Sequence, residues 1–145
     1  YNSDGSKKFK GEFTDGKIKG KGVTYYKDGK IKYDGEWKNN LKVKGTLYID
    51  GKIKYDGKWK NDKYYAGTYY YENGEKYIGS FKDDKKHGYG NLYYDNNKKK
   101  YKGDYKNGKE YDGAEYHKNG KLSRLFNDGK VLNKFDEKGN LIKKK

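Results

Sequence analysis

A short motif, aromatic-x-Gly-x-aromatic, recurs along this chain at intervals of 22 or 24 residues. Its five copies open at Phe9, Tyr33, Tyr55, Tyr77 and Tyr101. Periods of this length indicate supersecondary units that stack on their neighbours. We therefore expect one repeat domain over residues 1–145, with five repeats over 9–123 and a divergent C-terminal hairpin or cap over 124–145.

Each copy also carries two turn sequences rich in Asn, Asp and Gly. One series is Asp15-Gly16, Asn39-Asn40, Asn61-Asp62, Asp83-Asp84 and Asn107-Gly108, and the other is Asp28-Gly29, Asp50-Gly51, Asn73-Gly74, Asn96-Asn97 and Asn119-Gly120. Such pairs tolerate the positive φ angles of tight hairpin turns. Two of these turns, flanked by short alternating segments, predict one two-stranded hairpin per copy. The predicted fold class is all-β, an elongated, twisted, single antiparallel sheet of consecutive hairpins.

Alternation along a strand assigns residues to the two faces of this sheet. It places Ile31, Tyr33, Gly35 and Trp37 on one face and Lys32, Asp34 and Glu36 on the other. Glycine at a fixed strand position leaves room for an aromatic ring to lie across the backbone. We expect the opening rings and the two Trp rings to occupy that room. Repeated cross-strand ring contacts then stabilise the layer.

The composition agrees with an open, half-exposed layer. Charged residues make up 39% of the chain, which usually indicates disorder, but it also holds 19 Tyr, 5 Phe and 2 Trp. A buried Tyr needs a partner for its hydroxyl, so Tyr suits a thin layer with one wet side. The formal net charge of +15 favours anionic partners. Arg124 is the only Arg, and this weakens specific phosphate recognition, in which Arg binds in a bidentate manner.

Residues for catalysis or metal binding are scarce. There is no Cys for nucleophilic catalysis, and there are only two His residues. His117 occupies a position that is Tyr or Ile in other copies, which indicates a tolerated substitution. Carboxylates are dispersed with nothing like a calcium loop. We expect no enzyme, no cofactor and no metal site. No apolar run is long enough to span a bilayer. Because the chain starts at Tyr1 and contains no Met, we expect either that a leader has been removed or that the chain is a fragment. The expected location is that of an exported or cell-surface bacterial protein, with a cytoplasmic protein as the alternative.

Copies such as YDGEWKNN followed by KGTLYIDGK, and YIGSFKDDKKHGYGNLYYD, resemble the MORN repeat (membrane occupation and recognition nexus). That pattern is Tyr-x-Gly-x-Trp, a turn, His-Gly-x-Gly and an aromatic strand. The resemblance covers about Phe9 to Ser123, and the fullest His-Gly-x-Gly match is at residues 87–90. From about Asn119 onward the spacing resembles the bacterial variant of the repeat, which leaves the register of the last strands open.

The resemblance implies a grooved aromatic face that holds a partner segment or mediates self-association, and contact with acidic lipids has been proposed for such families. An aromatic strip rimmed by Lys also has the character of an interaction site. We expect a non-catalytic binding or scaffold protein. The candidate partner-binding residues are Trp37, Trp59, Phe81, Tyr105, Tyr26, Ile49, Tyr71 and Tyr94. The alternative is a module that binds anionic membrane lipid or cell-wall polymer through its Lys-rich face. Nucleic acid is disfavoured, because the rings that would stack on bases are needed by the sheet.

Overall fold

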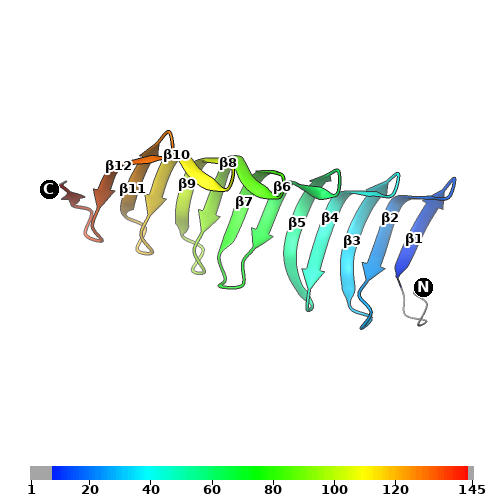
Figure 1. The fold of residues 1–145 in the computed structure, drawn as a ribbon. Coiled ribbons are helices and arrows are strands. Elements are labelled where there is room, and N and C mark those ends of the chain that lie inside the picture. The colour runs from blue at the N-terminus through cyan, green and yellow to red at the C-terminus, as the bar shows by residue number, and fades with distance from the viewer. Residues whose placement is uncertain (1–7, 144–145) are drawn as a thin grey trace. The chain divides into compact units, whose positions relative to one another are not determined.

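A computed structural model describes residues 8–143 and contains only strands within that range (Figure 1). The strands are β1 (Phe9–Thr14), β2 (Lys17–Tyr25), β3 (Ile31–Lys38), β4 (Leu41–Ile49), β5 (Lys52–Lys60), β6 (Lys63–Tyr70), β7 (Lys76–Lys82), β8 (Lys85–Tyr93), β9 (Lys99–Lys106), β10 (Lys109–Tyr116), β11 (Leu122–Asn127), β12 (Lys130–Phe135) and β13 (Leu141–Ile142). The predicted all-β class is confirmed.

The chain divides into two compact units, Tyr1–Tyr69 and Tyr70–Lys145. Strands β1 to β6 belong to the first unit, apart from the last residue of β6, and β7 to β13 belong to the second. Within each unit, the strand order follows the chain and neighbouring strands run antiparallel. Each of the five copies forms one hairpin, as predicted, and β11 to β13 follow them. The extent of the single repeat domain stays a prediction.

The first series of turns adopts the predicted geometry. Both central residues are left-handed, with φ of 50° and 66° at Asn39 and Asn40. These turns also join successive copies. The side-chain Oδ1 of Asn40 accepts a hydrogen bond from the Ile18 amide at 2.7 Å, and the Asn40 amide donates to the Ile18 carbonyl at 3.2 Å. Asp62 Oδ1 likewise accepts from the Lys42 amide at 3.0 Å.

The second series differs from the prediction of paired positive φ angles. In the loop from Tyr26 to Lys30, the Tyr26 amide donates to the Lys30 carbonyl at 2.9 Å, and only Gly29 is left-handed, with φ of 87°. Asp28 Oδ1 accepts a hydrogen bond from the Lys30 amide at 2.9 Å, so a side chain helps to stabilise the turn. The Gly29 amide also donates to the Tyr26 carbonyl at 2.9 Å. The same two backbone hydrogen bonds occur in the loops 71–75, 94–98, 117–121 and 136–140. Asp50-Gly51 alone in this series is a two-residue turn with both φ positive.

The opening Tyr rings form the core, because Tyr33, Tyr55, Tyr77 and Tyr101 are all 0% exposed. Each lies over a pair of facing glycines on adjacent strands. A Cβ added to Gly45 would lie 2.6 Å from the Tyr33 hydroxyl oxygen and 2.6 Å from the Gly35 Cα. The hydroxyl group donates to a carbonyl three residues on, for example from Tyr55 to Lys58 at 2.6 Å. The prediction that the opening rings pack over glycine is confirmed.

A bulge corrects the predicted face of Ile31. In the β2–β3 register, Thr24 faces Tyr33 but Tyr25 faces Ile31, so Lys32 is an extra residue. The Lys32 ammonium lies 5.7 Å from the centre of the Tyr26 ring, on the aromatic side. Ile31 therefore belongs with Tyr25 and not with Tyr33. Period-two alternation fails wherever a bulge inserts one residue.

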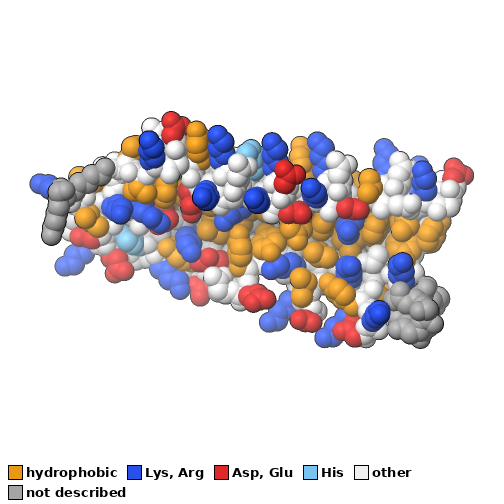
Figure 2. Space-filling view, viewed as in Figure 1, with side chains coloured by type: hydrophobic (Ala, Val, Ile, Leu, Met, Phe, Trp, Pro, Cys, Tyr) orange, Lys and Arg blue, Asp and Glu red, His pale blue; other side chains and the backbone are white. Residues whose placement is uncertain are grey.

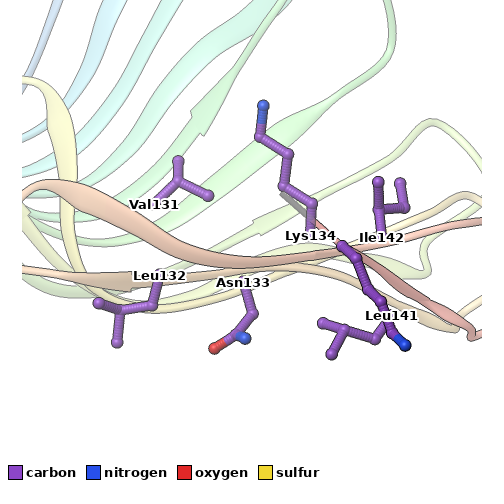
Figure 3. A pocket seen from close by; sticks show the side chains of 7 residues that line it. Val131, Leu132, Asn133, Lys134, Leu141 and Ile142 are labelled. Atoms are coloured by element: carbon purple, nitrogen blue, oxygen red, sulfur yellow. The ribbon is translucent and has the colours of Figure 1, made fainter. Parts of the chain in front are cut away.

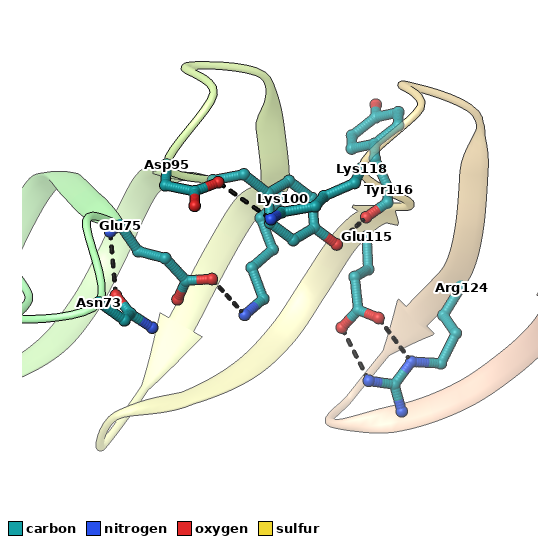
Figure 4. Close-up of polar contacts among 9 residues, drawn as sticks. Asn73, Glu75, Asp95, Lys100, Glu115, Tyr116, Lys118 and Arg124 are labelled. Carbon is teal, nitrogen blue, oxygen red and sulfur yellow. Dashed lines mark hydrogen bonds and ion pairs between the residues drawn. The ribbon is translucent and has the colours of Figure 1, made fainter.

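The structure also defines the register of the last strands. Arg124 faces Glu115 and Phe126 faces Gly113, whereas in the β4–β5 pair Tyr55 faces Leu47 and Gly57 faces Gly45. Arg124 thus occupies the place of an opening Tyr. Its Nε and Nη2 atoms donate to the two carboxylate oxygens of Glu115 at 2.9 and 2.8 Å (Figure 4). An ion pair replaces the ring on glycine at this end of the second unit.

Candidate binding face

In the first unit, aromatic rings pack edge to face in a continuous row. Ring centres are 5.8 Å apart for Phe9 and Trp37, 5.1 Å for Trp37 and Tyr33, 5.5 Å for Tyr33 and Trp59, and 5.0 Å for Trp59 and Tyr55. Such pairs are each worth about 0.5–1.5 kcal/mol beyond their buried area. The row therefore connects the first three copies energetically. Figure 2 shows the resulting hydrophobic band across these strands, with Lys side chains above and below it.

The two Trp residues are also tied to the backbone of the preceding copy. The indole Nε1–H of Trp37 donates to the Gly22 carbonyl at 3.1 Å, and that of Trp59 to the Gly45 carbonyl at 3.3 Å. Both side chains are 8% exposed. They form the floor of the face, so Trp59→Ala would remove structure together with surface.

The second unit repeats this row with other rings. Centres are 5.1 Å apart for Tyr77 and Phe81, 5.3 Å for Tyr77 and Tyr105, and 4.7 Å for Tyr101 and Tyr105. Phe81 is 8% and Tyr105 2% exposed. The structure thus brings Trp37 and Trp59 together through Tyr33, and Phe81 and Tyr105 together through Tyr77.

The predicted site residues in the second series of turns lie at the ends of the hairpins. The hydroxyl of Tyr26 donates to the Tyr48 carbonyl at 2.6 Å, and that of Tyr94 to the Tyr116 carbonyl at 2.7 Å. His117 Nε2 lies 2.9 Å from the Phe135 carbonyl oxygen in the same arrangement. These rings join one copy to the next, which the sequence did not reveal for His117. Ile49 is exposed and Tyr71 is half-buried.

Two Lys residues that sequence reasoning missed lie on the aromatic face. The Nζ of Lys42 is 5.6, 5.7 and 5.1 Å from the ring centres of Tyr33, Trp37 and Trp59. Lys86 Nζ is similarly placed over Tyr71, Tyr77 and Tyr105, at 5.7, 5.9 and 4.9 Å. Burial lowers the pKa of Lys86. Each of these two Lys residues comes five residues after the second aromatic of its motif. This spacing is the sequence feature from which their position could have been predicted.

The buried Tyr residues remain neutral at ordinary pH. Burial raises the pKa of Tyr55 and of Tyr101 to about 12, and it also raises the pKa of Tyr33, Tyr77 and Tyr105. The neutral hydroxyls of Tyr55 and Tyr101 already donate to carbonyls in their own strands. This arrangement suits packing and gives no group poised for proton transfer near neutral pH.

A groove of about 370 Å³ opens on the aromatic face of the first unit. It is lined by Lys8, Thr24, Tyr25, Tyr26, Lys27, Lys32, Trp37 and Lys42. Two of the predicted contact residues, Tyr26 and Trp37, therefore meet in one cavity. The groove combines fixed rings with four ammonium groups and is lined by no carboxylate.

Two further hollows contain less of the predicted site. One, of about 760 Å³, includes Trp37 but is lined by both signs of charge, from Glu12 and Glu36 as well as Lys19, Lys21 and Lys38. The other, of about 590 Å³, lies around β12 and β13 and is lined mainly by Val131, Leu132, Leu141 and Ile142 (Figure 3). Only the 370 Å³ groove, among these three hollows, is lined by acid-free aromatic surface.

Neither a metal centre nor a membrane-spanning helix occurs in the part of the chain that the structure describes. Over residues 8–143, no three His, Asp or Glu side chains group as metal ligands would. The same residues include no helix that is long and apolar enough to cross a membrane. His87 has a structural role, since its Nδ1 accepts from the Asn107 amide at 3.3 Å and its carbonyl accepts from Ser80 Oγ.

Comparison with known proteins agrees with this geometry. The family model for the MORN repeat matches residues 9–31, 33–52, 55–64 and 77–99, which together make up more than half of the chain. Its four matches fall on the first four hairpins, while the fifth, β9–β10, follows the same ring and glycine pattern. No curated protein matches the chain. MORN repeats are typically non-catalytic and generally bind proteins or membrane lipids. This chain belongs to the MORN-repeat family.

Proposed function

We propose that this protein is a non-catalytic binding or scaffold protein whose aromatic face holds a protein partner or a second copy of the chain. The observation that supports this most is the groove of the first unit, where the rings of Tyr26 and Trp37 are fixed by hydrogen bonds to the backbone. Fixed rings are favourable at interfaces because binding then costs little side-chain entropy. Aromatic anchors of this kind dominate binding energy in many complexes.

The eight candidate residues divide into two roles under this proposal. In the first unit, Trp37 and Trp59 supply the buried floor, and Tyr26 and Ile49 supply the rim. In the second unit, Phe81 and Tyr105 supply the floor, and Tyr71 and Tyr94 supply the rim. A partner helix or extended segment would lie on the floor and touch the rim. Lys side chains beside the floor would speed the encounter with an acidic partner.

Photo-crosslinking tests this proposal. A photoreactive amino acid replaces Lys32, which lines the groove, or Lys58, which faces Lys44 in the sheet and lies outside the groove. In the cells that make the protein, we expect the same adduct to form repeatedly from position 32 and not from position 58. An adduct of twice the mass of the chain would identify a second copy as partner. Adducts from position 58 alone would contradict the use of this face.

The net charge of +15 supports the alternative, a module for anionic membrane lipid or cell-wall polymer. Binding of that kind depends steeply on salt, because the exposed Lys charges are screened within about 10 Å at 0.1 M salt. Sedimentation with vesicles that contain phosphatidylserine, at low and high salt, tests it. Retention at high salt would exclude a purely electrostatic lipid mode.

A further inference from the structure

The residues that line the groove of the first unit have sequence counterparts in the second unit with different charge, and this difference points to a partner chemistry. Phe9 and Tyr77 open copies of equal length and lie 68 residues apart. Across this interval, Tyr26, Lys32 and Trp37 of the first unit correspond to Tyr94, Lys100 and Tyr105 of the second. The rings that build the site are thus retained in both units. The charged residues around these rings can therefore be compared between the two units of the same chain.

At the remaining charged positions the units diverge. Lys8, Lys27 and Lys42 of the first unit correspond to Lys76, Asp95 and Glu110 of the second. Together with Lys32 and its counterpart Lys100, these make four positions. All four are Lys in the first unit, and two of the four are acidic in the second. The second unit keeps its row of rings although Glu110 stands where Lys42 lies over the rings of the first unit. A row of rings therefore does not require Lys at this position, and the charge there can serve recognition.

The second unit also neutralises its charges internally. Lys100 Nζ lies 2.8 Å from Glu75 Oε2, and Lys118 Nζ lies 3.0 Å from Asp95 Oδ1 (Figure 4). In the first unit, Lys42 lies 3.7 Å from Asp62, and the remaining cations around the groove are not offset by any acidic lining residue. In the first unit, four Lys side chains therefore line a single groove that has no acidic lining residue, whereas Lys100 and Lys118 of the second unit are each paired with a carboxylate.

The polar atoms of the groove rings are already engaged. Tyr26 donates its hydroxyl to the Tyr48 carbonyl, and Trp37 donates its indole N–H to the Gly22 carbonyl. These two rings offer apolar surface, and the ammonium groups offer charge. A ligand that fits brings anionic groups and an apolar group close together. A volume of about 370 Å³ is at the small end for binding pockets, so the groove suits a short stretch of chain.

We propose that the groove of the first unit binds an acidic segment of a protein partner, with carboxylates beside Lys27, Lys32 and Lys42 and an apolar side chain on the Trp37 ring. The equivalent place in the second unit does not bind this segment. This inference rests on the proposed function, since it assigns partner chemistry to the same aromatic face.

Fluorescence of Trp37 provides the readout. A Trp59→Phe background leaves Trp37 as the only Trp, and Phe81 shows that Phe fits this position of the repeat. The probes are a synthetic Glu/Leu peptide and the same peptide with Gln in place of Glu. We expect the acidic peptide to change Trp37 fluorescence and to bind about tenfold more tightly than the Gln peptide at low salt, with the difference shrinking as salt screens it.

Exchange of residues between the units gives the decisive variants. Lys27→Asp with Lys42→Glu imports the second unit's charges and is expected to weaken the acidic peptide about tenfold or more, because like charges then meet across the interface. Lys44→Glu with Lys58→Glu makes the same change in net charge outside the groove and should have little effect. The loop variant Lys27→Asp alone covers the case in which Lys42→Glu disturbs the rings. The reciprocal pair Asp95→Lys and Glu110→Lys should raise the calorimetric stoichiometry from one peptide to two.

The outcomes separate the inference from the proposed function. Equal binding of the Gln and Glu peptides at Trp37, or charge exchange without effect, would overturn the acidic partner while leaving the aromatic face as the binding surface. No response of Trp37 to either peptide, together with crosslinks from position 58 alone, would overturn both. A response of Trp37 to phosphatidylserine vesicles but not to the acidic peptide would overturn the protein partner in favour of lipid.

Discussion

Replacing Gly67 by Ala tests the packing of ring on glycine that builds each hairpin. The added Cβ would lie 2.5 Å from the Asp56 carbonyl oxygen, 2.7 Å from the Gly57 Cα and 2.9 Å from the Tyr55 hydroxyl oxygen. The first two atoms are backbone of the paired strand, so no rotamer change relieves the contact. Overpacking of this kind costs about 1–3 kcal/mol. Because the strands themselves must separate, we expect a loss in the free energy of unfolding of about 3 kcal/mol, at the top of that range.

Urea unfolding, followed by Trp fluorescence, measures this loss. With an m-value of about 1–3 kcal/mol/M, the midpoint should fall by about 1–3 M. Gly29→Ala is the matched control, since a Cβ there meets nothing within 4 Å and the change carries only the strain of φ at 87°, about 1–2 kcal/mol. A Gly67→Ala variant no less stable than Gly29→Ala would refute the account of ring packing.

Three other perturbations have defined outcomes. Tyr55→Phe removes the 2.6 Å hydrogen bond to Lys58 but keeps the ring. Urea unfolding should therefore show a loss of about 1 kcal/mol in the free energy of unfolding. A loss above about 3 kcal/mol would contradict the view that the ring contributes more than the hydroxyl. Arg124→Lys keeps the charge but loses the bidentate bond to Glu115. Because the Arg124 side chain is 40% exposed, we expect the free energy of unfolding to fall by only about 0.5–1 kcal/mol in the same assay. An unchanged midpoint would contradict a stabilising role of this ion pair. The raised pKa values of Tyr55 and Tyr101 favour the neutral form in the folded state, so their contribution is complete below the ordinary pKa of 10.0 and is lost as pH rises through about 12. The part of the tyrosinate absorbance that comes from these buried rings should therefore appear together with loss of circular dichroism, and full ionisation of a still folded chain would contradict the burial.

Much of the fold could be predicted because the repeat supplies the same information five times. The opening rings, their glycines and the Asn/Asp turns recur at fixed positions, and each has a local physical reason. A ring such as that of Tyr33 needs Gly35 and Gly45 beneath it, and both are visible in the sequence. Antiparallel neighbours follow directly from the tight turns.

The face of a residue beyond a bulge could not be predicted. The extra residue at Lys32 moves Ile31 off the aromatic side, and the residue Val43, between the partners of Glu36 and Trp37, brings Lys42 opposite Trp37. Neither shift leaves a mark in a period-two pattern. The position of Lys42 over the rings, and with it the charge of the groove, therefore emerged only from the register.

The indole N–H of Trp37 reports most directly on whether the aromatic face is the binding surface. In a ¹H–¹⁵N NMR spectrum, addition of the Glu/Leu peptide should shift this signal, because the ring borders the groove, while the amide signals of Lys44 and Lys58 should stay in place. Shifts confined to Lys44 and Lys58, with the Trp37 indole unchanged, would contradict the account.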